Sequence, residues 1–134
     1  MYQNYHLSHE DAQKIIAAIQ AELKKGDGAA IAVVDAQGEL LAFVRTDGCR
    51  LPSINIAINK AYTAAREQVE SKDVGDASRA ENFAITNFGD LRYTGWGGGV
   101  PIKFKDQIVG AVGVSSLPED EDLRLARIGA ASIR

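Results

Sequence analysis

A run of glycines near residue 97 constrains this chain more than any other feature. The segment Tyr93-Thr94-Gly95-Trp96-Gly97-Gly98-Gly99-Val100-Pro101-Ile102 holds four glycines in five positions and the only tryptophan of the chain. Glycine lacks a Cβ and accepts positive φ angles, so the run suits a tight reversal or a close approach of backbone to a ligand. The alternative is a flexible loop. The glycines precede an apolar strand sequence and lack the Gly-x-x-x-x-Gly-Lys-Ser/Thr pattern, which excludes a phosphate loop.

Four apolar segments are predicted to form strands, in two hairpins with short polar turns. These segments are Ala29–Val34, Leu40–Thr46, Val100–Phe104 and Gln107–Ser115. Alternation in the first hairpin is weak, so we expect its strands to be covered on both faces. Gly110 and Gly113 would weaken the last strand unless another element comes close, so we expect tight packing there.

Helices are predicted before, between and after the hairpins. Ser8 can cap the first helix with Asp11 three residues later, and apolar residues then recur at helical spacing until Lys24-Lys25-Gly26. Further helices are expected from Pro52 to about Ser71, from Asp76 to about Asn87, and from Pro118 onward. The acidic residues 119–122 are interpreted as a solvated helix start. The order predicts an α+β fold, an antiparallel sheet with helices packed against it.

Composition limits the class of protein. With 134 residues and 46% apolar content, the chain is expected to form a single domain over 1–134. A net charge of −3 and the absence of any basic run argue against a nucleic-acid partner. The sequence shows no signal peptide or long apolar run, so we expect no membrane contact and a cytoplasmic location. Cys49 is the only cysteine, and no Cys/His cluster has the spacing of a metal site.

Five motifs in order resemble the GlcG/HbpS-type haem-binding family, which includes the C-terminal domain of one class of cobalamin adenosyltransferases. They are residues 33–40 (VVDAQGEL), 45–48 (RTDG), 56–64 (IAINKAYTA), 97–102 (GGGVPI) and 110–115 (GAVGVS). The resemblance implies a profilin-like fold, a five-stranded antiparallel sheet between helical layers. It also implies homo-oligomers, haem binding or degradation, and bacterial operons for using glycolate, propanediol or glycerol. The family usually has Gly-Val-Ser-Gly where this chain has Gly113-Val114-Ser115-Ser116.

Candidate ligand-binding residues come from the family motifs. They are Arg45, Asp47, Lys60, Thr63, Trp96, Gly97, Gly98, Gly99 and Pro101. Arg45 and Lys60 could clamp a carboxylate or a haem propionate, and Trp96 could stack on a planar ring. The alternative for Arg45 and Asp47 is a structural ion pair at a strand end.

Haem, the possible cofactor, needs an axial donor. His6 and His9 are the only histidines and are the leading axial candidates, because imidazole nitrogen is the usual donor. Tyr93, Tyr62 and Met1 are weaker alternatives. An exposed, inert role for both histidines is the competing interpretation.

Three functional hypotheses follow. The first is a homo-oligomeric module that binds haem or a related tetrapyrrole. The second is an enzyme acting on a small hydroxy acid, diol or aldehyde, with Arg45 and Lys60 gripping it. The third is a structural subunit whose glycine run packs on a neighbour. Many small apolar positions support a homo-oligomer in each case. For Gly98 we expect a backbone approach to the ligand, so that Gly98→Ala loses binding while the fold survives.

Overall fold

The computed structural model describes residues 1–133, in which four strands form one antiparallel sheet in the order β2-β1-β4-β3. The strands are β1 (Ala30–Asp35), β2 (Leu40–Arg45), β3 (Gly99–Phe104) and β4 (Gln107–Ser115). Both predicted hairpins are confirmed, and β1 pairs with β4 so that Ala30 faces Ser115 and Asp35 faces Gly110. The α+β class is confirmed, but the five strands implied by the resemblance are wrong for the described residues.

The segment before the first helix explains why the sheet stops at four strands. It lies beside the start of β4, beyond the point where β1 ends at Asp35. Leu7 N donates to Val109 O at 3.0 Å, while Tyr5 N donates only to the side-chain oxygen of Gln107 at 3.2 Å. One backbone bond does not make a ladder, so this segment docks on the sheet without becoming a strand.

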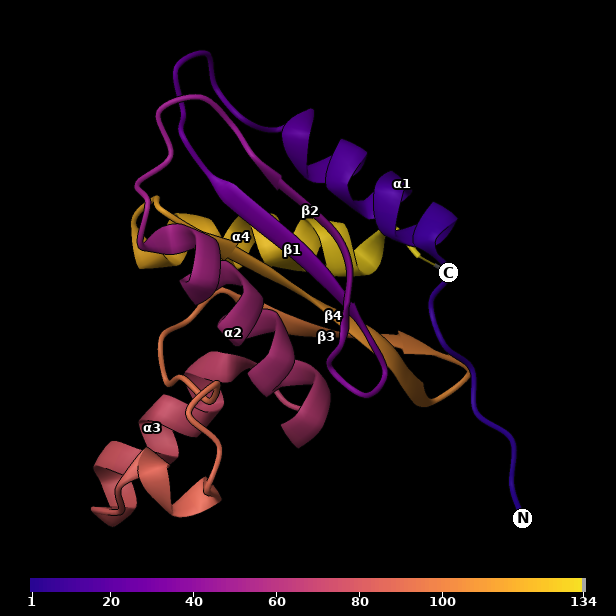
Figure 1. Ribbon diagram of the computed structural model, residues 1–134, viewed down its shortest axis with the longest axis vertical. Helices are drawn as coiled ribbons and strands as arrows, with labels where there is room; N and C mark the ends of the chain where they lie inside the picture. The colour runs from indigo at the N-terminus through magenta and orange to yellow at the C-terminus, as the bar shows by residue number, and fades with distance from the viewer. Residues whose placement is uncertain (134) are drawn as a thin grey trace.

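Helices cover both faces of the sheet (Figure 1). Helices α1 (His9–Gln20) and α4 (Glu119–Ala131) pack on one face, and α2 (Ser53–Glu67) packs on the other. Helix α3 (Ser71–Glu81) and the short 3₁₀ helix η1 (Ile85–Phe88) extend beyond the sheet and lead into the glycine run. Ser8 and Asp11 form the predicted capping box of α1.

The two faces bury different side chains. Large aliphatic residues of β1, such as Ile31 and Val33, point toward α1 and α4, whereas Ala30 and Ala32 point toward the alanines of α2. These β1 residues are fully buried, as weak alternation predicted. The same prediction was wrong for β2, which lies at the edge of the sheet and is half-buried or exposed along its length. A Cβ on Gly113 would collide with the carbonyl oxygen of Ala57 in α2. The expected tight packing on β4 is therefore confirmed, and it lets α2 lie directly on the sheet.

Three of the predicted helices have other boundaries in the structure. The helix expected from Pro52 to about Ser71 ends at Glu67, because Gln68 takes a left-handed conformation with φ 59°. The helix expected over 76–87 begins earlier, at Ser71, and ends at Glu81 before the left-handed Asn82. Helix α1 also ends at Gln20 rather than near Gly26. Left-handed Gln and Asn give no strong sequence signal, whereas glycine at such a position does.

Candidate functional site

The glycine run forms one wall of a cavity that we call the loop pocket. Its volume is about 380 Å³, and it lies between the start of α2, the end of β4 and the start of α4. Its lining is Arg50, Pro52, Ser53, Ile56, Lys60, Trp96, Gly97, Ser115, Ser116, Leu117, Glu119 and Asp122. The cavity therefore brings together residues far apart in sequence, from Arg50 to Asp122.

A buried ion pair forms the floor of the loop pocket. Lys60 is 3% exposed, and its Nζ donates to Val114 O at 2.9 Å and to Asp122 Oδ2 at 3.2 Å. Asp122 is 2% exposed, and its other oxygen accepts from Leu117 N at 3.2 Å. Burial raises the pKa of Asp122 to about 6 although Lys60 opposes the change, and burial lowers the pKa of Lys60 although Asp122 opposes it.

Two buried hydroxyl groups also face this cavity. Ser53, at the first position of α2, and Ser115, the last residue of β4, are each 5% exposed and line the loop pocket. Among residues 1–133 no buried side-chain nitrogen or oxygen lacks a hydrogen-bond partner, so neither hydroxyl is an unsatisfied buried group. A serine hydroxyl can both donate and accept, so the two side chains offer hydrogen bonds to a molecule that enters the cavity.

The glycine run is held by specific hydrogen bonds. Ser71 Oγ, at the start of α3, donates to Trp96 O at 2.7 Å and accepts from Gly99 N at 2.9 Å. Gly97 N donates to Glu119 Oε1 at 3.1 Å, which ties the run to α4. The flexible-loop alternative is therefore wrong, because the backbone of the run is bonded on both sides of Gly98.

Gly98 faces the protein interior rather than the open cavity. Its φ of +125° is a conformation that residues with a side chain rarely adopt. A Cβ there would lie 2.6 Å from Val114 O, 3.0 Å from Lys60 Nζ and 3.2 Å from Asp122 Cβ. The close approach expected at Gly98 is real, but its neighbours are the strand and the buried ion pair.

The residues that the motifs suggested divide between regions. Lys60, Trp96 and Gly97 line the loop pocket. Gly98 and Gly99 are buried beside it, and Pro101 lies further along β3. Thr63 is one turn beyond Lys60, and its Oγ1 donates to Asn59 O at 2.8 Å and accepts from Thr94 N at 3.0 Å. Thr63 thus fixes the approach to the glycine run and does not reach the cavity.

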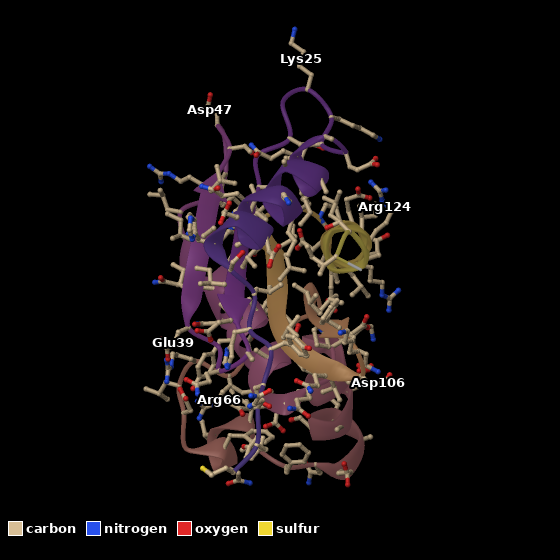
Figure 2. The ribbon with its side chains drawn as sticks, turned by 90° about the vertical axis from the view of Figure 1, so that its right-hand side faces the viewer. Lys25, Glu39, Asp47, Arg66, Asp106 and Arg124 are labelled. Atoms are coloured by element: carbon tan, nitrogen blue, oxygen red, sulfur yellow. The ribbon has the colours of Figure 1, made fainter. Side chains whose placement is uncertain are left out.

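Arg45 and Asp47 lie elsewhere. They line a separate cavity of about 270 Å³ together with Thr46, Gly48 and Cys49. Asp47 projects from one end of the molecule, away from the sheet (Figure 2). Within residues 1–133 no ion pair joins Arg45 to Asp47, so the structural ion pair considered from the sequence does not form.

Sequence reasoning missed several residues of the loop pocket. Arg50, Ser53 and Ser115 were not singled out, and Glu119 and Asp122 were interpreted as part of a solvated helix start. The spacing of the two acids held a signal, because residues three apart lie on one face of a helix. Asp122 instead pairs with Lys60, and Glu119 holds Gly97.

A second cavity, the N-terminal pocket, contains His6. Its volume is about 250 Å³, and it is lined by Tyr5, His6, Leu7, Asp11, Phe104, Val109 and Ile133. The rings of Tyr5 and Phe104 meet edge to face at 5.2 Å, and Lys105 Nζ lies 5.5 Å from the Tyr5 ring centre. His9 is exposed at the first position of α1 and does not line this cavity.

The two pockets lie at opposite ends of β4. Val109 belongs to the N-terminal pocket and Ser115 to the loop pocket, about 20 Å apart at ~3.4 Å per residue. Figure 1 shows the N-terminus beyond the end of the sheet that is far from the start of α2. One chain therefore does not bring either histidine to the glycine run.

The weaker axial candidates are engaged elsewhere. The Tyr62 hydroxyl donates to Asp90, and burial raises its pKa. The Tyr93 hydroxyl donates to Glu67 Oε2 at 2.7 Å, and burial with that bond raises its pKa to about 12. Met1 is fully exposed. Across residues 1–133, no cluster of three or more His, Cys, Asp or Glu side chains could hold a metal ion, and no helix is long and apolar enough to cross a membrane.

Comparison with known proteins places the chain in a family. A family model described as "Haem degrading protein HbpS-like" matches residues 7–131. The chain belongs to the HbpS-like family. Protein GlcG of Escherichia coli K12 is 40% identical over 110 residues, which are 81% of each chain. A double mutant of HbpS from Streptomyces reticuli is 30% identical with a TM-score of 0.88, covering 100% of this chain and 91% of that one. A PduOC–haem complex shares the fold at 21% identity and a TM-score of 0.82, with 96% of each chain covered.

Proposed function

We propose that this HbpS-like protein binds haem or a related tetrapyrrole at the N-terminal pocket. It would serve as an accessory protein of a bacterial operon for using glycolate, propanediol or glycerol. The observation that carries the proposal is that His6 lines a cavity together with apolar and aromatic side chains and one acidic residue, Asp11. The family's haem-degrading description and the fold shared with a PduOC–haem complex support it.

The residues of the N-terminal pocket fit a haem group in three respects. His6 offers an imidazole nitrogen, the usual axial donor to haem iron. Leu7, Val109 and the Phe104 ring give the apolar surface that a macrocycle needs. Lys105, near the Tyr5 ring, offers a cation for a propionate. Bound haem would supply iron redox chemistry, while this chain would bind and orient it.

The size of the N-terminal pocket bears on affinity and assembly. Its volume of about 250 Å³ is below the range of roughly 300–1,000 Å³ typical of small-molecule sites. One chain would therefore cover only part of a haem, and we expect weak, exchangeable binding. A homo-oligomer with closed symmetry would cover more of the ligand with a second copy.

Haem titration of matched histidine variants tests this function. We expect the wild type and His9→Ala to give the same Soret shift and His6→Ala a much smaller one. The reason is that His6 lines the N-terminal pocket and His9 does not. Light scattering should give a mass above the 14.4 kDa of one chain. Equal Soret shifts in the wild type and the double variant would remove both histidines from the site and end the proposal.

A second candidate function is favoured by the loop pocket. This cavity, about 380 Å³, combines Lys60 and Arg50 with the carboxylates of Glu119 and Asp122. Such a polar set suits a small hydroxy acid, diol or aldehyde better than a macrocycle, because cations grip a carboxylate and carboxylates accept from hydroxyls. Arg50 takes the place that the sequence assigned to Arg45, which lines another cavity.

A further inference from the structure

Lys60 occupies an unusual position for a lysine, buried in the protein yet part of a cavity wall. Its side chain is 4% exposed, and the little surface that remains belongs to the loop pocket. A buried ammonium is disfavoured relative to the neutral amine, which is how enzymes make lysine nucleophilic. The carboxylate of Asp122, 3.2 Å away, is placed to receive the proton.

The surroundings of Lys60 differ from those of an ion pair that only holds elements together. A purely structural pair needs no cavity beside it, whereas both Lys60 and Asp122 line this one. Ser53 and Ser115 line the same cavity. A nucleophile, a proton acceptor and two hydroxyl groups thus line one cavity.

We propose that Lys60 forms an imine with a small aldehyde or 2-oxo acid that enters the loop pocket and is held by Arg50 through its carboxylate. The proposal rests on the loop pocket being a ligand site, the second candidate function above. Arg50 suits this role because its backbone N–H is fixed to Ser116 Oγ at 3.0 Å while its side chain is exposed at the cavity. A guanidinium binds a carboxylate in two-point geometry.

The step balances without an oxidant or reductant. The Lys60 ammonium gives a proton to Asp122, and the neutral amine attacks the carbonyl carbon as the C=O π bond breaks. A proton passes from nitrogen to oxygen to give the carbinolamine, whose hydroxyl the Ser53 or Ser115 hydroxyl can bind. Asp122 returns its proton to that hydroxyl, water leaves and the C=N bond forms. The protonated imine carries the charge that Lys60 began with and stays paired with Asp122.

Reductive trapping tests this assignment. The folded protein is incubated with glyoxylate and cyanoborohydride at neutral pH, and each lysine is followed by peptide mass mapping. We expect carboxymethylation of Lys60 about 100-fold faster than of Lys72, an exposed lysine that also pairs with an aspartate. Burial lowers the pKa of Lys60 and favours its neutral amine, whereas the bond to Asp76 raises the pKa of Lys72. Labelling of Lys60 at or below the rate of Lys72 would overturn the proposal.

Two variants and a second aldehyde test the role of Arg50. Arg50→Ala should lower the glyoxylate rate at Lys60 and should leave unchanged the rate with acetaldehyde, which has no carboxylate. Arg124→Ala, an exposed arginine on α4, is the matched control and should change neither rate. An Arg50→Ala protein as fast as wild type with glyoxylate contradicts the Arg50 assignment.

Binding is measured separately by amide NMR shifts at Trp96 and Gly97 in the absence of reductant. Shifts with glyoxylate but no label on Lys60 would exclude the imine and leave the loop pocket as a ligand site. If glyoxylate produces neither amide shifts nor a label on Lys60, both the imine and the ligand site are excluded.

Discussion

The loop pocket and the N-terminal pocket lie at opposite ends of β4 and are built in opposite ways. The loop pocket draws its walls from α2, β4, α4 and the glycine run, and its central charges are nearly inaccessible to solvent. The N-terminal pocket depends on a segment docked by few hydrogen bonds, with Tyr5 47% exposed and His6 also exposed. Substitutions of the buried charges in the loop pocket should therefore affect folding, whereas substitutions at the N-terminal pocket should affect ligand binding alone.

Removing the amine of Lys60 should produce the largest loss of stability. Lys60→Met keeps most of the side-chain volume but leaves the Asp122 carboxylate buried without its partner. Breaking a buried pair in this way costs about 3–5 kcal/mol of unfolding free energy. Urea denaturation measures this loss, with Lys72→Met as the exposed control, for which we expect a much smaller loss because water screens the pair. A loss below 1 kcal/mol for Lys60→Met would contradict the idea that the buried charges of the loop pocket stabilise the fold.

The pH dependence of stability should follow the Asp122 carboxyl group. Its pKa is raised from 3.8 to about 6 in the folded protein, chiefly by burial. The native state then holds the proton more tightly than the unfolded state, so this contribution is complete below pH 3.8 and is lost as pH rises through 6. We expect the stability advantage of the wild type over Asp122→Asn to shrink by up to about 3 kcal/mol between pH 4 and pH 7. An advantage that grows over this range would mean that Lys60 controls the carboxyl group more than burial does.

Substitution of Gly98 should cost more stability than its place in a glycine loop suggests. Gly98→Ala forces a side chain onto φ +125° and against Val114 O and Lys60 Nζ. Backbone strain of this kind costs about 1–3 kcal/mol, and displacement of Lys60 should add loss of ligand binding in the loop pocket. Contrary to the expectation from sequence, we therefore predict that stability and binding fall together.

Gly89→Ala is the matched control for Gly98→Ala. Gly89 also has a positive φ, +71°, but an added Cβ there meets nothing within 4 Å. Its melting temperature should drop less than that of Gly98→Ala. Equal drops would mean that the backbone angle matters and the contacts with the ion pair do not.

Local features of the fold could be predicted from the sequence, because their causes lie close together in the chain. The capping box of α1 needs only Ser8 and Asp11, and both hairpins follow from short turns between apolar runs. Gly113 indicated a close neighbour, and the structure supplies α2. The left-handed residues Gln68 and Asn82, which end helices, gave no comparable signal.

The candidate site was harder to predict because its contacts are long-range. Lys60 and Asp122 are 62 positions apart, and only the packing of α2 and α4 around the end of β4 brings them together. Arg45 and Arg50 are close in sequence, yet the turn between them sends them to different cavities. The motifs identified the correct region through Lys60 and the glycine run. They could not show which charged residues would meet there.

Trp96 provides the smallest and most selective test. Its side chain is 58% exposed, and it lies between the loop pocket and a shallow cavity of about 400 Å³ lined by residues such as Leu91 and Tyr93. A core tryptophan would cost roughly 3–5 kcal/mol on truncation. Exposure excludes that role, so Trp96→Ala should cost less than about 1 kcal/mol. Ligand affinity at the loop pocket should nevertheless fall, because the indole forms part of the cavity wall.

Leu91→Ala, 91% exposed and outside that wall, is the control and should leave affinity unchanged. Titrations of both variants, with haem and with glyoxylate, compare the two pockets directly. A Trp96→Ala protein that loses haem binding but keeps glyoxylate binding would contradict both assignments, because it would place the haem site at the loop pocket and the glyoxylate site elsewhere.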